Sequence, residues 1–472
     1  MLSSSFSIPY FLIASFLLLN LGVGLASRKA TTFRAYAVDD KRFSTVKLLA
    51  TLLATSFCGV VLVSPVQVCY SYGLLQFCLM FVNAIALWLT SLAWVRMAPF
   101  MHHLSIAETI GSVYGNYPRI ITALLSIWYT ISTLIFQINA ISYIVTACLH
   151  SVDPNSMIVL AALVIITYAA FGGIRSVTNT DVLQFITFII IIIIVAKLMF
   201  VKTGKSFLEI IWFARKQEKF KLSSLCYPDS HLWDCIVYFL FCLLSIVDPA
   251  IIQRMYMCSG PIQVKKVFLY GSFLYVLIML FICLIGLFVF SSNSTLSMEE
   301  IWGYIVTSLP SFLQGAIVTC VLAMATSTAD SYLHLCSIIV VHDLMASIPG
   351  VKPIVDRLQI RVARLAILGI GLFSMIMAIY SNDLWKSFSS IVFYVYTLYN
   401  VVVSAPFILA CFGFRGSART ALVGMAMAIL MSLACKKFRF LIGIPACVAS
   451  MVANGCIYSR HWLIMNCIPL FS

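Results

Sequence analysis

The sequence predicts an all-α membrane protein of about thirteen transmembrane helices in a single domain, residues 1–472. Of its residues 62% are hydrophobic and 10% are charged, whereas a typical globular domain carries about 25% charged residues. Apolar runs of about 20 residues, the length that crosses a bilayer, recur from end to end. Two of these runs, five spans apart, are interrupted by glycine or proline, as in transporters built from two inverted repeats.

Each expected span lies on one apolar run. The first run lacks a preceding basic segment and is too long for a signal-peptide core, so we expect it to span the membrane. The 16 cysteines form no CxxC pair, which predicts small buried apolar side chains rather than disulfides or zinc ligands. The approximate spans are 7–27, 46–72, 74–98, 120–148, 157–171, 181–201, 232–250, 267–291, 311–342, 363–380, 388–413, 420–435 and 440–458.

The net charge of +14 is distributed over loops, and no basic run is large enough to bind a nucleic acid. Because cytoplasmic loops are enriched in Lys and Arg, we expect the N-terminus outside and the C-terminus inside a cell (inner or plasma) membrane. Arg119, Arg175 and Arg254 are among the basic residues assigned to inner loops. The basic segment 202–224 is an exception, since it falls on the outer side.

The interrupted spans divide the chain into two expected repeats, about 46–201 and 232–413, with peripheral helices 7–27, 420–435 and 440–458. The second span contains Gly59 and Ser64-Pro65, and the seventh contains Asp248-Pro249 near its inner end. Interrupted helices at matching positions mark the binding site of such transporters. The alternative is two unrelated proline kinks.

A polar stretch, "ATSTADSYLHLCS" (325–337), interrupts the ninth span. On a helix Ser327, Ser331 and His334 share one face, and Asp330 lies four residues before His334. Isolated hydroxyls in membrane helices often bond their own i−4 carbonyls, but intramembrane carboxylates usually mark an ion path. Hydroxyl and carbonyl oxygens suit small hard cations such as Na⁺, and protons carried by Asp330 or His334 remain the alternative.

Five stretches together resemble the sodium/solute symporter family, which includes proline, pantothenate and sugar cotransporters. The resemblance covers nearly the whole chain and implies a LeuT-type core of two five-helix repeats. The five stretches are "SIAETIGSVYGNYPRI" (105–120), "FGGIRSVTNTDVLQ" (171–184, like the family signature GG-x3-V-x2-TD-x2-Q), "DPAIIQRMY" (248–256), "STADSYLHLCSIIVVHDL" (327–344) and "APFILACFGFRGSARTALVGM" (405–425).

The resemblance implies a sodium site and an ion path. Two backbone carbonyls of the family's second span fall on Ala54 and Phe57. One carbonyl and two adjacent hydroxyls of the ninth span fall on Met324, Ser327 and Thr328. Asp181 matches an acidic residue near the inner exit of the sodium path, although a helix N-cap of the sixth span would also explain it. The family pattern does not explain Asp330; we assign it to the path because intramembrane carboxylates usually mark one.

The expected solute-binding residues are Ser56, Gln137 and Ser245. Ser56 stands where relatives carry aspartate or asparagine, and helix–helix hydrogen bonding would also account for Gln137. Val61 and Phe241 occupy positions at which sugar-transporting relatives carry residues that contact the sugar. These departures favour an amino acid, vitamin or organic acid over a sugar.

We therefore expect Na⁺-coupled symport of a small organic solute by alternating access, with Na⁺ as the coupling ion and the lipid bilayer as surroundings. The sequence offers no nucleophile–base pair or phosphate loop, so we do not expect an enzyme. The alternatives are a proton-coupled or degenerate family member, a transporter-like sensor without a catalytic domain, and a channel.

Overall fold

The computed structural model describes residues 7–27, 30–149, 153–225, 231–244, 247–347, 355–381, 385–438 and 444–467. Within these residues every regular element is helical. The long helices are α1 (Ser7–Leu25), α3 (Thr45–Ser56), α4 (Gly59–Tyr72), α5 (Leu74–Ala93), α7 (Asn116–Cys148), α8 (Pro154–Lys202), α10 (His231–Leu244), α12 (Pro261–Ser292), α14 (Ser311–Ile338), α15 (Asp356–Ser381), α16 (Trp385–Cys411), α17 (Ala418–Phe438) and α18 (Ile444–Cys467). The short ones are α2 (Phe33–Val38), α6 (Ile106–Tyr114), α9 (Phe207–Lys216), α11 (Pro249–Met257) and α13 (Glu300–Thr307), with a π-helical turn, η5 (Ile339–Leu344), after α14.

The long helices are those of a multi-pass membrane protein. In the described part of the chain, nine helices are long and apolar enough to cross a bilayer, or ten when α3 and α4 count as one broken span. Helix α8 is 49 residues long, more than twice the length one span needs, and it is broken at Gly173. The total of thirteen spans stays a prediction.

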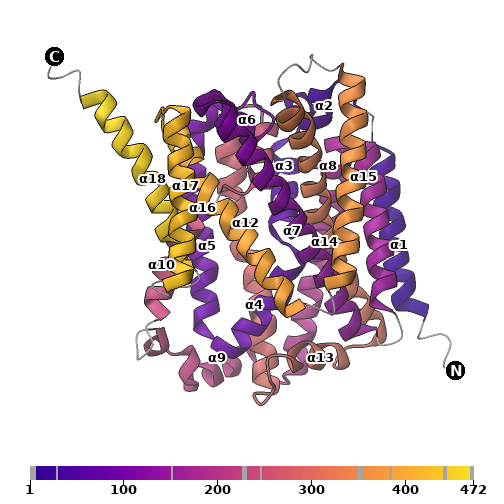
Figure 1. The fold of residues 1–472 in the computed structure, drawn as a ribbon. Coiled ribbons are helices and arrows are strands. Elements are labelled where there is room, and N and C mark those ends of the chain that lie inside the picture. The colour runs from indigo at the N-terminus through magenta and orange to yellow at the C-terminus, as the bar shows by residue number, and fades with distance from the viewer. Residues whose placement is uncertain are drawn as a thin grey trace.

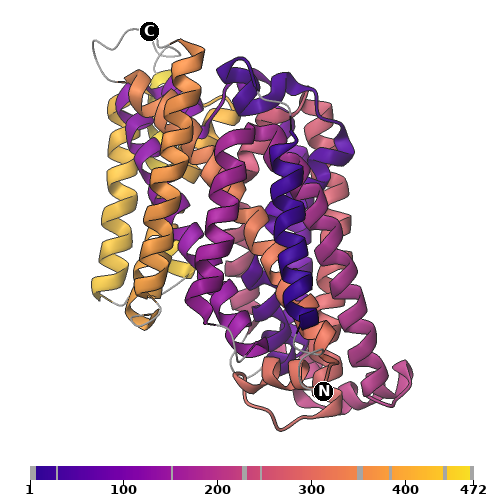
Figure 2. The same ribbon diagram turned by 90° about the vertical axis from the view of Figure 1, so that its right-hand side faces the viewer.

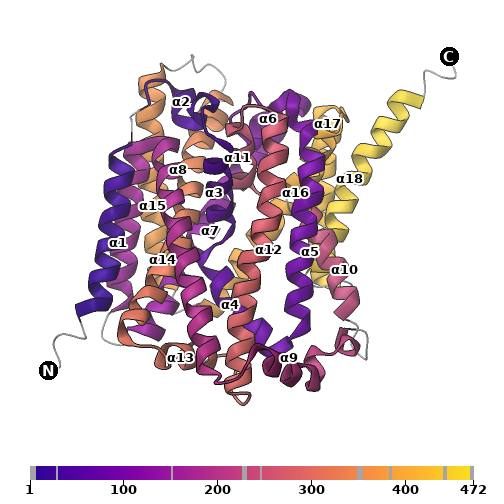
Figure 3. The same cartoon turned by 180° about the vertical axis from the view of Figure 1, so that it is seen from behind.

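The helices pack around α14, which is the most enclosed: 83% of its apolar window is buried, against 28–67% for the other spans. Helices α2 and α6 lie at one end of the bundle, and α9 and α13 lie at the opposite end (Figure 1). Helix α1 runs along the outside of the bundle beside α8 (Figures 2 and 3). The start of α1 and the end of α18 lie at opposite ends of the bundle (Figure 1).

The second expected span is broken, but not at the proline. Helices α3 and α4 meet at an angle of 62°, and the backbone leaves helical geometry at Phe57 and Cys58. Pro65 lies inside α4 and does not end it. A cap explains the position of the break: the Gln137 side-chain oxygen on α7 accepts a hydrogen bond from the backbone N–H of Gly59, 3.1 Å away, and so satisfies the start of α4.

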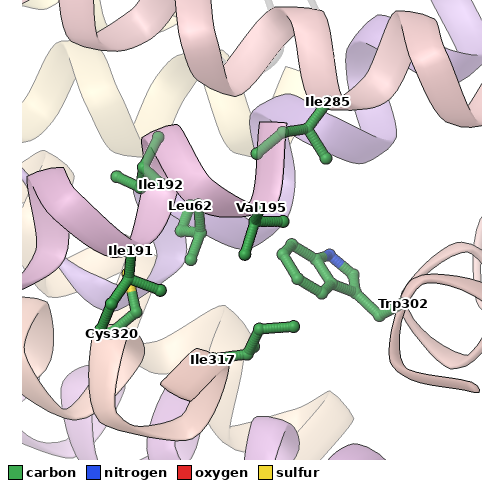
Figure 4. Close-up of a pocket in the computed structure, with 8 residues that line it drawn as sticks. All are labelled: Leu62, Ile191, Ile192, Val195, Ile285, Trp302, Ile317 and Cys320. Atoms are coloured by element: carbon green, nitrogen blue, oxygen red, sulfur yellow. The ribbon is translucent and has the colours of Figure 1, made fainter. Parts of the chain in front are cut away.

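A small apolar cavity, lined in part by α13, can be excluded as a solute site. Its volume is about 10 Å³, which is about the minimum for a single water. The eight lining residues are Leu62, Ile191, Ile192, Val195, Ile285, Trp302, Ile317 and Cys320 (Figure 4). The Trp302 indole N–H donates to the Val63 carbonyl at 3.2 Å, so the polar atom of this lining is already satisfied.

The kink in α8 depends on one glycine. Gly173 has φ 63°, a left-handed conformation that costs little only for glycine. A Cβ atom there would lie 2.8 Å from Cδ2 of Tyr36 on α2. This kink therefore lets α2 pack directly on α8.

Replacing Gly173 with alanine should lower the melting temperature of the purified protein by several degrees, because both the backbone conformation and the contact with Tyr36 disfavour a Cβ atom. Differential scanning fluorimetry in detergent measures this. Gly369→Ala is the matched control: Gly369 lies within α15 with no atom within 4 Å of its added Cβ, so it should leave the melting temperature unchanged or raise it. Equal effects of the two substitutions would contradict this account of the kink.

A buried histidine lies before α6, outside the spanning helices. Its Nδ1 atom is 2.9 Å from Oγ1 of Thr109, and only 5% of His103 is exposed. Burial lowers the pKa of His103 from 6.5 to about 4, although the charge of Glu108 opposes the shift. The folded protein therefore holds this imidazole neutral at neutral pH.

Because the folded-state pKa lies below the unfolded one, the stability that depends on neutral His103 is present above pH 6.5 and is lost as the pH falls from 6.5 towards 4. We expect His103→Gln to flatten the decline in melting temperature over this pH range. His102→Gln serves as the control, because His102 is exposed, and it should keep the wild-type profile. Identical profiles for all three proteins would rule out this role for His103.

Candidate ion and solute site

The polar stretch of α14 lies beside the break between α3 and α4. The Thr328 hydroxyl is 3.2 Å from the Thr55 carbonyl of α3 and 3.1 Å from the Met324 carbonyl of its own helix. On either side of Thr55 in the chain, the carbonyls of Ala54 and Phe57 accept no backbone hydrogen bond among the described residues. The break therefore leaves carbonyl oxygens without backbone donors close to a hydroxyl, the ligand chemistry that a small hard cation requires.

Ser327 points away from Thr328, toward α8. Its hydroxyl donates to Oδ1 of Asp181 at 2.8 Å, and Thr51 on α3 donates to the other carboxylate oxygen. Asp181 is fully buried and lies within α8, eight residues after the kink at Gly173. The alternative that Asp181 caps the start of a helix is therefore wrong, and its carboxylate joins α3, α8 and α14.

Arg254 was expected in an inner loop, but the structure places it in the core. It belongs to α11 and is 1% exposed. Its Nη2 atom lies 3.2 Å from Oδ2 of Asp181 and 2.9 Å from the Thr55 hydroxyl, and it also contacts Ser331. Burying a guanidinium is costly unless it is paired, so Asp181 is the partner that retains Arg254 inside.

Asp330 and His334, four residues apart on α14, contact different helices. Asp330 turns to α8, where Oδ2 accepts from the Tyr168 hydroxyl at 2.7 Å and the Thr180 hydroxyl at 3.2 Å. The ring of His334 instead packs against that of Tyr36 on α2, with 4.9 Å between their centroids. Both side chains are fully buried.

The polar cluster carries an uneven charge. With both carboxylates ionised, Asp181 and Asp330 supply two negative charges and Arg254 supplies one positive charge. The two carboxylates are linked through Ser331, whose hydroxyl lies 3.4 Å from Asp330 and also contacts Arg254. A surplus of one negative charge in a buried site favours binding of one monovalent cation.

The structure describes two of the three expected solute-binding residues. The Ser56 hydroxyl donates to the Leu52 carbonyl of its own helix at 2.7 Å, as isolated serines in helices do. Gln137 caps α4 at the break. Ser245 lies outside the described residues.

Sequence reasoning missed Arg254, Tyr168 and Thr180 as members of the polar cluster. Thr180 directly precedes Asp181, and helical spacing alone could not show that it contacts a different carboxylate. Arg254 had one usable signal: within the nine residues of α11 only Gln253 and Arg254 are strongly polar. Arg254 was assigned to a loop because the predicted seventh span ended at residue 250.

These features define a secondary transporter of the broken-helix class. The sequence model of the sodium:solute symporter family matches residues 36–428, and this chain belongs to that family. Membership confirms the expected family, in which solute movement is coupled to Na⁺, and confirms a transporter rather than an enzyme. It also confirms a multi-pass membrane protein.

Two curated relatives are sialic acid transporters. The sodium/sialic acid symporter SiaT of Proteus mirabilis (strain HI4320) is 24% identical over 65% of this chain and 66% of its own length. The sodium/sialic acid symporter NanT of Aliivibrio fischeri (strain ATCC 700601 / ES114) is 20% identical over 70% of this chain and 68% of its own length. The match to SiaT thus spans slightly less than two thirds of that relative.

Solved structures show the same fold. A Na⁺-coupled sialic acid symporter in a substrate-bound, outward-open state superposes with a TM-score of 0.87 at 21% identity, over 98% of both chains. MhsT in complex with L-phenylalanine gives 0.54 at 12% identity, over 89% of this chain and 97% of that one. Mhp1, a nucleobase-cation-symport-1 transporter in a closed conformation with bromovinylhydantoin bound, gives 0.58 at 11%, over 93% and 96%. The predicted LeuT-type all-α fold is therefore confirmed.

The pairing of Arg254 with Asp181 predicts strong coupling between the two positions. Arg254→Met should destabilise the protein by roughly 3–5 kcal/mol, because it leaves a buried carboxylate without its cation. Adding Asp181→Asn should recover part of that loss. Urea or SDS unfolding of the two single variants and the double variant measures the coupling energy; strictly additive effects would show that the pair does not act as a unit.

Proposed function

We propose that this protein moves a small organic solute across the membrane together with Na⁺ by alternating access. The observation that carries the proposal is the hydroxyl of Thr328 beside the α3–α4 break, where neighbouring carbonyls have no backbone donors among the described residues. Membership of the sodium:solute symporter family supports it. The solute-binding residues proposed are Ser56, Gln137 and Ser245, and the proposed repeats span about 46–201 and 232–413.

The proposed Na⁺ ligands are the backbone carbonyls of Ala54, Phe57 and Met324 and the hydroxyls of Ser327 and Thr328. In the described conformation the Ser327 hydroxyl donates to Asp181, so it would turn, or share its oxygen, when Na⁺ binds. No cluster of three or more His, Cys, Asp or Glu side chains that could hold a metal occurs in the described part of the chain. An oxygen-lined site of low charge suits Na⁺ better than a divalent or soft metal.

The surplus negative charge around Asp181 and Asp330 gives the ion an electrostatic reason to enter. Na⁺ bound between α3 and α14 would hold the first repeat's broken helix against the second repeat. That contact favours one arrangement of the two repeats, and solute bound between them would favour it too. Coupling then follows because each ligand raises the affinity for the other by about 1–3 kcal/mol.

We propose that Asp181 and Asp330 form the route by which Na⁺ leaves toward the face that carries α2 and α6. Arg42, Lys47 and Arg175 line a hollow together with Asp39, which ends α2, and Arg119 packs against Gly111 of α6. This basic character supports a cytoplasmic location. The N-terminus would then lie outside and the C-terminus inside a cell membrane.

Proton coupling is the second candidate, and one observation favours it. Asp330 accepts hydrogen bonds from Tyr168 and Thr180 but forms no ion pair with a described residue. Protonation would remove the surplus negative charge as effectively as Na⁺ binding. Uptake into proteoliposomes with an imposed Na⁺ or H⁺ gradient separates the two: uptake driven by protons alone would overturn the sodium assignment.

Replacing Thr328 with alanine should raise the Na⁺ concentration for half-maximal uptake by about tenfold or more, because a site of about five oxygens tolerates few losses. Thr319→Ala is the matched control. Thr319 lies on the same helix, is 6% exposed and bonds only its own Gly315 carbonyl at 2.8 Å. It should keep the wild-type Na⁺ dependence; a shift of equal size in both variants would assign the effect to helix α14 in general rather than to an ion ligand.

A further inference from the structure

A further carboxylate, only partly buried, lies directly before α11, away from the ion cluster. Asp248 precedes α11, and its Oδ1 atom accepts from the backbone N–H groups of Ala250 at 2.8 Å and Ile251 at 3.0 Å. The carboxylate therefore caps α11. Helix capping accounts for one oxygen of Asp248 and leaves the other to be explained.

Tyrosines from two helices contact the second oxygen, and two tyrosines of a third helix pack on one of them. Oδ2 accepts hydrogen bonds from the hydroxyls of Tyr129 on α7, at 2.8 Å, and Tyr332 on α14. Tyr396 and Tyr399 on α16 pack on the Tyr129 ring with centroid distances of 4.9 and 4.7 Å. We call these four tyrosines, with Asp248, the tyrosine cage.

The charge of the cage is not balanced within the described residues. No lysine, arginine or histidine among them lies within 4 Å of the Asp248 carboxylate. The nearby Arg254, six residues further along, is directed to Asp181. Four neutral donors satisfy the oxygens of Asp248 without cancelling its charge, and a charge in this setting is costly without a partner of opposite sign.

The cage is positioned to meet a solute. Asp248 keeps accessible surface while most of the α11 residues that follow it are buried, and Tyr396 is likewise only partly buried. Tyr332 lies one helical turn beyond Thr328 on α14, next to the proposed ion site. The region between the broken helices of the two repeats is where transporters of this architecture bind their substrates.

We propose that the tyrosine cage binds a positively charged organic ammonium group of the transported solute. Opposite charge attracts the group to Asp248, and tyrosine rings stabilise such cations through cation–π contacts. This inference rests on the proposed function and specifies its substrate class.

The hydrogen bonds of Asp248 further restrict the ammonium. A carboxylate offers about four lone-pair sites, and four donors already occupy them. A primary ammonium needs acceptors for its N–H groups and would have to displace a tyrosine. A quaternary ammonium needs none, so the cage favours it. A carboxylate such as that of sialic acid, named for the curated relatives, would meet repulsion here.

The test uses ligand-induced thermal stabilisation of the full-length protein, purified in detergent and assayed in NaCl. Choline and ethanolamine form a matched pair that differs only in methylation of the nitrogen, and N-acetylneuraminic acid is the anionic probe. We expect choline to stabilise the protein at the lowest concentration, ethanolamine at a higher one, and the anion not at all. Stronger stabilisation by ethanolamine would still support the ammonium site, with one tyrosine displaced.

Asp248→Asn removes the charge but keeps a good helix N-cap. It should weaken choline binding at least about tenfold, since charge attraction to the ligand is lost. Asp153→Asn is the matched control: Asp153 also precedes a proline and caps a helix, with its carboxylate 2.9 Å from the backbone N–H of Ser156. It should bind choline like the wild type.

The inference is overturned if no ammonium probe stabilises the wild type, if Asp248→Asn binds choline as tightly as the wild type, or if the anion stabilises the protein. Failure of the proposed function gives a different result. Choline that binds equally well in NaCl and KCl would contradict Na⁺ coupling and leave the ammonium site standing. Na⁺-driven uptake of N-acetylneuraminic acid would support Na⁺ coupling and contradict the ammonium site.

Discussion

The buried contact between Arg254 and Asp181 is the interaction on which the rest of the core depends. It joins α11 of the second half to α8 of the first, and the same carboxylate receives Ser327 of α14 and Thr51 of α3. Four helices thus meet at one charged group that could not remain buried alone. The pair does not neutralise the site, since Asp330 adds a second carboxylate nearby. With both carboxylates ionised, a surplus negative charge remains, and we propose that it attracts the coupling cation to this contact.

The regions before α4 and before α11 offer different groups to a ligand. At the α3–α4 break, carbonyls and hydroxyls without formal charge provide oxygen ligands for a small cation. At the start of α11, Asp248 and its tyrosines provide charge and aromatic surface for the larger organic cation that we propose. Both regions border α14, through Thr328 and Tyr332 on successive turns. In the proposed function, α14 contacts both sites, so filling one can change the affinity of the other, as coupled transport requires.

Much of this could be predicted from the sequence, because bilayer thickness fixes the length of apolar runs and the density of polar groups in "ATSTADSYLHLCS" is improbable in lipid. The broken second span was also predictable, but its position was not: Pro65 stays helical, and the break comes where Gln137 can cap Gly59. The position of the break therefore depends on the Gln137 side chain, which lies 78 residues further along the chain than Gly59. Arg254 was misplaced for a related reason, since positive residues near span ends are normally loop residues. Only the position of Asp181 in three dimensions shows that this arginine lies inside. The spacing of Asp330 and His334 likewise did not show that each contacts a different helix, α8 and α2.

The central claim is that the surplus charge near Asp330 is balanced by a coupling cation. Equilibrium binding of radiolabelled Na⁺ to the purified protein tests it most directly, with Asp330→Asn as the comparison. The account predicts saturable Na⁺ binding that K⁺ does not displace and that weakens strongly in Asp330→Asn, because the variant removes the charge that favours the ion. Absence of saturable Na⁺ binding to the wild type, or the same affinity in both proteins, would contradict it.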